Sequence, residues 1–454
     1  MPLLSVNPND GTRLSERREW SPEQVEQALR EAAAAAPGWG QTALASRCRL
    51  LRGAAGMLRD RRDKLARLAT MEMGKLFSEA QREIEKCAWV CEHYADRSEI
   101  YLADDPVSTD AARSFVAFEP LGTILAIMPW NFPFWQVFRF AAPALAAGNN
   151  VILKHASNVS LCALAIEELL GKEVFLPGVF QTMLVSSARI RKVIGDPRVR
   201  AVTFTGSREA GTNVARAAGE NLKKAVLELG GSDAFIVLED ADLEKTVASA
   251  VTARYQNAGQ SCIAAKRFIV VESIAQRFSE LFREEVRSLK LGDPLASDVS
   301  LAPMAGRELR DELDGQVKDA IAAGAHPIIG CRPADGPGAH YQASILDKVT
   351  PGMRAYDEEL FGPVAAIIRV RDEASAVEVA NDTRFGLGAS VWTEDAARGE
   401  AVARRLQCGN AFVNGIVKSD PRLPFGGVKE SGFGRELSRQ GQHEFVNAKT
   451  VWVA

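Results

Sequence analysis

Three residues that could perform chemistry stand beside turn-forming or glycine-rich sequence. Cys262 follows Asn257-Ala258-Gly259, and a cysteine thiolate is a strong nucleophile. Glu228 lies between leucines and precedes two glycines; burial there would raise its pKa toward that of a general base. Asn131, within Pro129–Trp135, offers an uncharged amide N–H of the kind that stabilises an oxyanion. A nucleophile, a base and an oxyanion donor are therefore all available.

Each residue also has a plain structural interpretation. Cys262 could be a small buried apolar residue, Glu228 an exposed residue where a strand ends, and Asn131 a turn residue that caps its own backbone. The segment 204–211, FTGSREAG, predicts a strand, a glycine turn and a helix start. It matches neither dinucleotide fingerprint nor phosphate loop, although a helix N-terminus there could still bind a pyrophosphate.

The elements that must position these residues alternate along the chain. Ser21-Pro22-Glu23-Gln24 predicts a capped helix that runs to Pro37-Gly38, and further helices are expected over 43–101. The expected strands lie at 113–122, 123–130, 149–154, 179–186, 201–206, 224–231, 233–240, 267–272, 365–370, 388–393 and 409–415, with helices at 241–258 and 273–290. This alternation predicts an α/β fold with a doubly wound, mostly parallel sheet and a second α/β unit after about residue 240. The final segment, 443–454, reads as a strand that could pair with 110–120 or with another chain.

Composition excludes several classes of protein. The chain has 454 residues, 46% of them hydrophobic, and a formal net charge of -3, so no basic excess indicates a nucleic-acid partner. Its seven cysteines are odd in number and irregularly spaced, which predicts free thiols and no metal site. The N-terminus lacks a signal-peptide pattern, and polar residues and prolines interrupt the most apolar region, so we expect a cytoplasmic protein without a membrane partner.

Taken together, the motifs resemble those of the aldehyde dehydrogenase superfamily along nearly the whole chain. PWNFP, the lysine after VIL, FTGS, ELGG, GQSC, EELFGP and PFGGVKESGFGRE occur in the family's order and spacing. The segments QSCIAAKRF, NGIVKSDPRLPFGGVK and GRELSRQGQHEFVN are similar to those of its succinate-semialdehyde dehydrogenase branch.

The resemblance implies NAD(P)-dependent oxidation of an aldehyde to a carboxylate. Cys262 would attack the carbonyl, and the Asn131 amide and the Cys262 N–H would hold the oxyanion. Hydride transfer would leave a thioester that water, activated by Glu228, hydrolyses. The implied cofactor-binding residues are Trp130, Lys154, Ser157, Gly206, Ser207, Leu229, Glu359 and Phe361.

The residue at position 157 indicates which cofactor is preferred. Many NAD-dependent members carry a glutamate at this position, three residues after Lys154. A serine removes a charge that would repel a 2′-phosphate, so we expect NADP to be preferred, with NAD as the other acceptor. The alternative is that Ser157 is a neutral surface residue and discrimination lies elsewhere.

The resemblance also implies a substrate with a distal carboxylate, succinic semialdehyde. Arg139 would face the substrate channel and Ser419 would make a second contact, whereas Gln256 replaces an arginine found in some members. Arg139 could instead form a surface ion pair. Other small aldehydes (glutaric semialdehyde, lactaldehyde), a CoA-acylating enzyme and a catalytically silent relative remain alternatives.

The resemblance finally implies a division into domains. Residues 1–103 and 123–230 would form the dinucleotide-binding domain, 231–438 the catalytic domain, and 104–122 with 439–454 a small β oligomerisation arm. A homodimer or homotetramer is expected to assemble through that arm.

Overall fold

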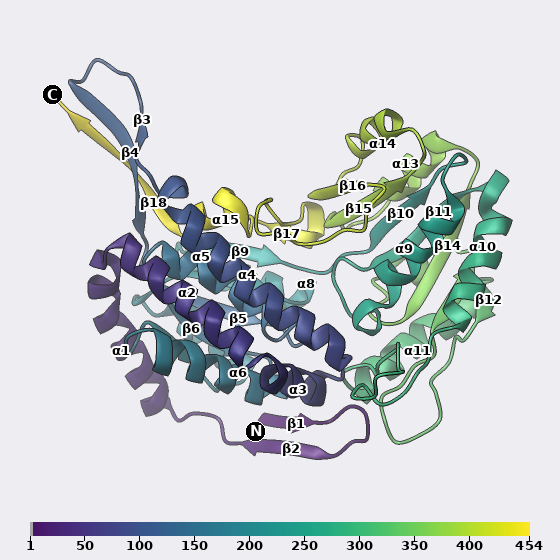
Figure 1. Ribbon diagram of the computed structural model, residues 1–454, viewed down its shortest axis with the longest axis horizontal. Helices are drawn as coiled ribbons and strands as arrows, with labels where there is room; N and C mark the ends of the chain where they lie inside the picture. The colour runs from purple at the N-terminus through teal and green to yellow at the C-terminus, as the bar shows by residue number, and fades with distance from the viewer. Residues whose placement is uncertain (1–2) are drawn as a thin grey trace.

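The computed structural model describes residues 3–454. Two α/β halves lie side by side, and a narrow β arm projects from the first half (Figure 1). The hairpin of β1 (Leu3–Val6) and β2 (Arg13–Arg17) packs beneath the first half near the N-terminus. The expected α/β architecture with a small β arm is confirmed.

The first half is built on a six-stranded sheet. Its strands are β5 (Thr123–Met128), β6 (Asn150–His155), β7 (Phe180–Thr182), β8 (Val199–Thr205), β9 (Lys224–Glu228) and β17 (Gly432–Phe433), in the order β17-β9-β8-β5-β6-β7. All pairs are parallel except β17 with β9. The strand order reverses between β5 and β8, and in such a doubly wound sheet ligands bind beyond the carboxyl ends of the strands at this switch point.

Helices cover both faces of this sheet. They are α1 (Pro22–Gln41), α2 (Leu44–Asp60), α3 (Arg62–Met73), α4 (Phe77–Tyr101), α5 (Trp135–Ala146), η1 (Ser157–Val159), α6 (Ser160–Ile166), η2 (Glu167–Val174), η3 (Ser187–Arg189), α7 (Ile190–Gly195), α8 (Arg208–Glu220) and α15 (Ser438–His443). The buried side chains of α2 to α6 form one apolar cluster, and those of α1, α7 and α8 contribute to a second. None of the described helices is long and apolar enough to cross a membrane.

The second half contains a seven-stranded sheet. Its strands are β10 (Asp233–Val237), β11 (Ala265–Val271), β12 (His326–Ile329), β13 (Ser344–Asp347), β14 (Val364–Val370), β15 (Gly388–Trp392) and β16 (Asn410–Val413), in the order β12-β13-β14-β11-β10-β15-β16. Only the edge strand β12 is antiparallel to its neighbour. The associated helices are α9 (Leu243–Tyr255), η4 (Gln256–Gly259), α10 (Glu272–Arg287), α11 (Arg307–Ala322), α12 (Arg354–Asp357), α13 (Glu373–Asn381), α14 (Ala396–Ala403) and η5 (Lys429–Ser431).

The arm resolves the pairing of the terminal strand. β18 (Val446–Val453) pairs antiparallel with β4 (Arg113–Pro120), which also pairs with the short β3 (Asp105–Pro106). Trp452 and Val453 near its tip are about half exposed. Of the two expected partners, the segment 110–120 of the same chain is therefore the one observed.

Several element boundaries differ from the sequence-based expectation. Ser21 and Gln24 form the expected capping box, but α1 continues through Pro37 because Trp39 is buried and donates to the carbonyl of Asn149 at 3.0 Å. The strand expected over 179–186 is only β7. The helix expected to reach residue 258 ends at Tyr255.

Candidate active site

The site lies where the two sheets face each other end to end. Asn131 follows the carboxyl end of β5, and Glu228 is the last residue of β9. Cys262 stands three residues before the amino end of β11. The carboxyl ends of the first sheet therefore meet the amino ends of the second, and the three expected catalytic residues come from both halves.

An unusual backbone loop presents Cys262. Asn257 and Ala258 have φ angles of 56° and 51°, and Gly259 has 72°. A residue with a Cβ rarely adopts this conformation, and a Cβ at position 259 would lie 2.3 Å from the Gly362 carbonyl oxygen. The loop is thus strained and tightly packed, as functional loops often are.

Arg254 holds this loop in place. Its buried guanidinium donates to the carbonyls of Gly259 at 2.6 Å, Gly362 at 2.7 Å and Ala265 at 3.0 Å. Burial lowers its pKa to about 10, so it stays charged at neutral pH. Carbonyl dipoles gathered around a buried cation offset part of its desolvation cost.

Cys262 lies at the junction of two cavities. The first, of about 190 Å³, is lined by α4, α5 and the segment 416–419, and we call it the narrow pocket. The second, of about 750 Å³, opens at the carboxyl ends of β5 and β8, and we call it the large pocket. Cys262 and Gln136 line both. A small molecule in the narrow pocket and a dinucleotide-sized one in the large pocket would therefore meet at the sulfur.

The resting thiol is protonated. Burial raises the pKa of Cys262 to about 12, although the positive charges of Arg139 and Lys266 oppose this shift. Glu228 and Glu359 add to the increase because a nearby negative charge disfavours the thiolate. Nucleophilic attack therefore requires removal of the thiol proton once the site is filled.

Two amide groups are available to an oxyanion near the sulfur. Asn131 is buried and donates one N–H of its side chain to the Gln260 carbonyl at 3.2 Å, which leaves the other N–H without an acceptor among residues 3–454. The backbone carbonyl of Asn131 accepts from the Asn257 side chain at 3.0 Å. No acceptor in the described chain takes the backbone N–H of Cys262. Such preorganised donors stabilise a developing oxyanion.

Glu228 is buried without a hydrogen-bond partner for either carboxyl oxygen within the described chain. Burial raises its pKa well above the ordinary value, the charge of Glu436 raises it further, and Arg139 and Arg435 lower it. Arg139 forms a buried ion pair with Glu436. Glu436, paired with Arg139, is therefore the more readily ionised of the two carboxyls, and the pKa of Glu228 is the more strongly raised. Glu228 lines neither pocket, so it must turn toward one of them to act on water.

The large pocket gathers most of the residues expected to bind the cofactor: Trp130, Gly206, Ser207, Leu229, Glu359 and Phe361. Ser207 caps the N-terminus of α8 by accepting from the Ala210 N–H, so the turn resembles known pyrophosphate sites. Trp130 and Phe361 meet edge to face with ring centroids 5.8 Å apart. These features fit a dinucleotide.

Lys154 and Ser157 lie apart from this lining. Lys154 is buried at the end of β6, where burial lowers its pKa. Ser157 starts η1 and lines a separate cavity of about 10 Å³.

Lys266, which the sequence reasoning missed, links the nucleophile loop to the cofactor side. Its ammonium donates to the carbonyls of Ser261 and Cys262, each at 2.8 Å, and lies 3.1 Å from Glu359. Glu359 also accepts from the Gly231 N–H at 3.1 Å. The sequence signal for Lys266 is its position four residues after Cys262.

The narrow pocket contains the three residues expected to contact substrate: Arg139, Gln256 and Ser419. Arg139 is neither on the surface nor free, because its guanidinium is buried against Glu436 and lies 4.9 Å from the Phe425 ring centroid. Ser419 accepts hydrogen bonds from Lys86 at 2.9 Å and from the Trp135 indole at 3.0 Å. Lys86 is a second residue that the sequence reasoning missed.

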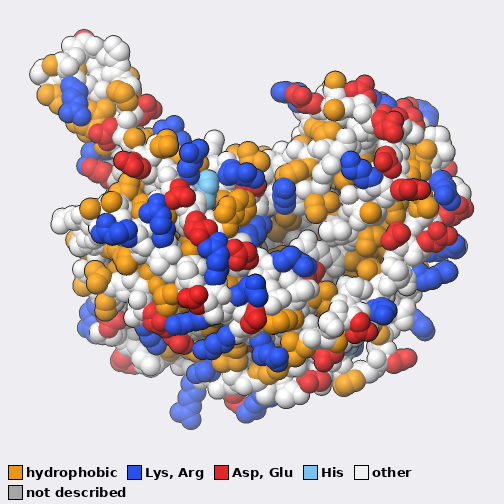
Figure 2. Space-filling view, viewed as in Figure 1, with side chains coloured by type: hydrophobic (Ala, Val, Ile, Leu, Met, Phe, Trp, Pro, Cys, Tyr) orange, Lys and Arg blue, Asp and Glu red, His pale blue; other side chains and the backbone are white. Residues whose placement is uncertain are grey.

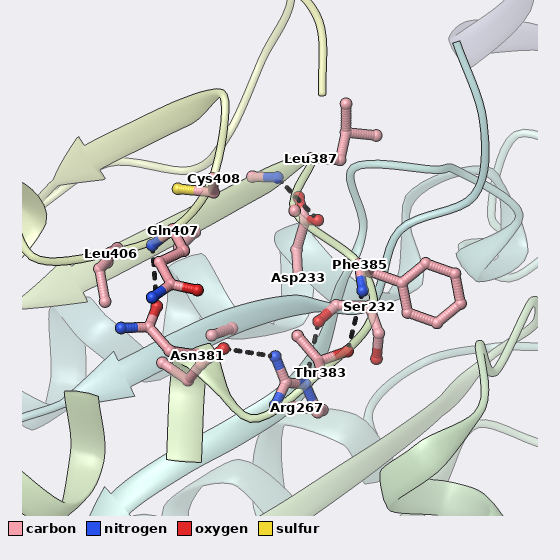
Figure 3. A pocket seen from close by; sticks show the side chains of 15 residues that line it. Ser232, Asp233, Arg267, Asn381, Thr383, Phe385, Leu387, Leu406, Gln407 and Cys408 are labelled. Carbon is pink, nitrogen blue, oxygen red and sulfur yellow. Dashed lines mark hydrogen bonds between the residues drawn. The ribbon is translucent and has the colours of Figure 1, made fainter. Parts of the chain in front are cut away.

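A fourth cavity, of about 10 Å³, lies in the second half beside the start of β10 and has room for about one water (Figure 3). Arg267 donates there to the carbonyls of Ser232 at 3.0 Å and Ala380 at 2.9 Å, and Asp233 accepts from the Gly388 N–H at 3.0 Å. Burial raises the pKa of Asp233 to about 7. These bonds fix the crossing from Glu228 to β10. Among residues 3–454, no cluster of His, Cys, Asp or Glu could hold a metal ion.

Comparison with known proteins identifies relatives of this chain. The model of the aldehyde dehydrogenase family matches residues 2–451. A protein of Synechocystis sp. named "Probable succinate-semialdehyde dehydrogenase [NADP(+)]" is 49% identical over 454 residues, all of both chains. The succinate semialdehyde dehydrogenase [NAD(P)+] Sad of Escherichia coli is 46% identical over 99% of this chain and 97% of its own. The crystal structure of succinic semialdehyde dehydrogenase from Streptococcus pyogenes in complex with NADP+ superposes with a TM-score of 0.97 at 37% identity, covering 99% of each chain.

Proposed function

The chain belongs to the aldehyde dehydrogenase family, and from this premise we propose that it oxidises succinic semialdehyde to succinate with NADP as preferred acceptor. The observation that carries the proposal is the position of Cys262, where a narrow pocket with cationic side chains meets a large pocket at the switch point of a parallel sheet. The overall reaction takes aldehyde, water and NADP⁺ to carboxylate, NADPH and two protons.

The first step forms a bond between the Cys262 sulfur and the aldehyde carbon. The thiol loses its proton, and the carbonyl oxygen becomes an oxyanion held by the free N–H of Asn131 and the Cys262 N–H. When bound in the large pocket, the cofactor supplies a hydride acceptor. Loss of hydride from the substrate carbon leaves a thioester on Cys262.

Hydrolysis of the thioester falls to Glu228. The raised pKa of Glu228 means that its carboxylate binds a proton more tightly than an ordinary one does, as a base for water requires. Attack by hydroxide on the thioester carbon breaks the carbon–sulfur bond, and the thiolate of Cys262 regains a proton. A base for water distinguishes this reaction from transfer of the acyl group to CoA.

Cofactor choice is proposed to rest on Ser157. Lys154 and Ser157 would face the adenosine ribose, Gly206 and Ser207 the pyrophosphate, and Glu359 the nicotinamide ribose. Ser157 carries no charge to repel a 2′-phosphate. The names of the curated relatives, which specify NADP(+) or NAD(P)+, support this assignment.

The proposed setting is a cytoplasmic homodimer or homotetramer. The seven cysteines are all free thiols, as a reducing compartment would keep them. The half-exposed apolar residues of β18 support assembly through the arm. Size-exclusion chromatography with light scattering gives the subunit number directly.

The function is tested by following NADPH or NADH at 340 nm with succinic semialdehyde, glutaric semialdehyde, lactaldehyde and butanal, each with NADP or NAD and with or without CoA. The proposal expects the highest kcat/KM with succinic semialdehyde and NADP, independent of CoA. A clear preference for another aldehyde, a requirement for CoA, or no activity with any aldehyde contradicts it.

A further inference from the structure

The narrow pocket contains a group of hydrogen-bond donors without a matching acceptor. The Lys86 ammonium, from α4, donates to the Ser419 hydroxyl oxygen at 2.9 Å, and the Trp135 indole N–H donates to the same oxygen at 3.0 Å. Lys86 also lies 4.1 Å from the Trp135 ring centroid. All three residues line the pocket beside Cys262.

The direction of these bonds determines where the Ser419 proton points. An ammonium and an indole N–H can only donate, so the Ser419 oxygen accepts both bonds and both of its lone pairs are used. Its single O–H must then be donated elsewhere, and no acceptor in the described part of the chain takes it. The Ser419 hydroxyl and the remaining N–H groups of Lys86 therefore require an acceptor from outside the protein.

The positive charge of Lys86 is also uncompensated. Of the carboxylates near it, Glu83 accepts from the N–H groups of Phe134 and Trp135 and pairs with Lys75, while Asp420 pairs with Arg422 at 2.6 Å. Lys86 itself forms no ion pair within residues 3–454. Arg139, the other cation deep in the pocket, is neutralised by Glu436.

We propose that Lys86 is the specificity-determining cation of the narrow pocket, and that its ammonium, with the Ser419 hydroxyl, binds the distal carboxylate of the aldehyde. The assignment rests on the proposed function, and it adds which residue supplies the positive charge that binds the substrate carboxylate. A carboxylate supplies the acceptors that both donors lack, and hydrogen bonds between charged groups are the strong ones. Figure 2 shows acidic and basic side chains interspersed over the face that it draws, without a broad patch of one sign.

The assignment implies a dependence on pH. Burial lowers the pKa of Lys86 to about 8, and the charge of Arg139 contributes to the decrease. Cys87, Asp420 and Glu83 oppose it. The other charged residues lining the pocket are Glu79, Arg82 and Lys418. The ammonium is therefore charged below about pH 8 and neutral above, whereas the substrate carboxylate is ionised throughout.

The test compares kcat/KM for succinic semialdehyde with kcat/KM for butanal, an uncharged aldehyde of equal chain length, from pH 6.5 to 9.5. The ratio of the two cancels titrations that affect both substrates, including that of Cys262. We call this ratio the charge preference, since it measures how much better the charged aldehyde is used than the uncharged one. In the wild type the charge preference should fall as the pH rises through about 8. In Lys86→Met it should fall about 10- to 100-fold at pH 7 and lose its pH dependence, with kcat for butanal retained. In Lys86→Arg the preference should persist to pH 9.5, because a guanidinium does not titrate there.

Lys418→Met serves as the matched control, since it removes another lysine ammonium from the lining of the same pocket. A loss of preference in Lys418→Met equal to that in Lys86→Met would show a general field effect and overturn the assignment. An unchanged preference in Lys86→Met, or equal losses for both aldehydes, would also overturn it. If the wild type shows no preference for succinic semialdehyde over butanal, the proposed function itself fails.

Discussion

Replacing Arg139 with methionine should destabilise the protein by leaving a buried carboxylate without its cation. The side chains of Arg139 and Glu436 are only 2% and 3% exposed. Removing one partner of such a pair costs about 3–5 kcal/mol, because the remaining charge is neither solvated nor paired. Glu228, buried beside Glu436, loses the same stabilising cation.

The pH dependence follows from the same carboxylate. Without Arg139 the folded-state pKa of Glu436 rises further above that of the unfolded chain, since Arg139 is the group that lowers it. The unfolded chain then loses this proton at lower pH than the folded chain does. The loss of stability relative to wild type is therefore absent at low pH, where Glu436 is protonated in both folded proteins, and grows by up to about 1.4 kcal/mol per pH unit above the folded-state pKa of wild-type Glu436. It should be clearly larger at pH 8.0 than at pH 5.5.

Urea unfolding of wild type and Arg139→Met at these two pH values measures the effect, with Arg139→Met/Glu436→Gln as the control. The double variant should recover most of the loss at pH 8.0, because its buried amide carries no charge. Equal losses at both pH values, or no recovery in the double variant, would refute the assignment of the charge to Glu436.

Four further substitutions test the site. Cys262→Ala should abolish NADPH formation, whereas Glu228→Gln should give a single burst of NADPH and a trapped thioester, visible by mass spectrometry; steady turnover by either variant contradicts the mechanism. Ser157→Glu should lower kcat/KM for NADP about tenfold or more relative to NAD, measured with saturating aldehyde. Arg254→Met should remove the buried hydrogen bonds to the carbonyls of Gly259, Gly362 and Ala265 and lower both the thermal midpoint and kcat; unaltered kinetics would exclude its positioning role.

Much of the fold was predictable because its strands are short apolar runs between glycine or polar residues. β5, β6, β8 and β10 all begin within two residues of the expected positions. The predicted end of α1 was wrong because the burial of Trp39, a tertiary contact, outweighs the helix-ending signal of Pro37-Gly38. The boundaries of the domains remain a prediction, and β17, at residues 432–433, pairs with the first sheet although it lies in the segment assigned to the second.

The motifs of the sequence singled out the residues proposed as catalytic, but they did not predict the surroundings of the narrow pocket. Lys86 lies within the amphipathic helix α4, where the sequence predicts a solvent-exposed lysine. Its true environment follows from the packing of α4 against α5, which local sequence does not reveal. The partner of Arg139 was hidden for the same reason, since Glu436 is almost 300 residues away along the chain. Long-range pairing of charges leaves no trace in local periodicity.

The strained loop before Cys262 has a consequence for how such an enzyme can change its substrate. Left-handed backbone at Asn257 to Gly259, and three carbonyls fixed by Arg254, leave the nucleophile little freedom to tolerate substitution. Several side chains that line the narrow pocket, Lys86 among them, come from α4 and α5 in the other half of the molecule. Part of the pocket thus rests on a scaffold separate from that of the thiol, so mutations in these helices can retune selectivity while the reacting thiol keeps its geometry.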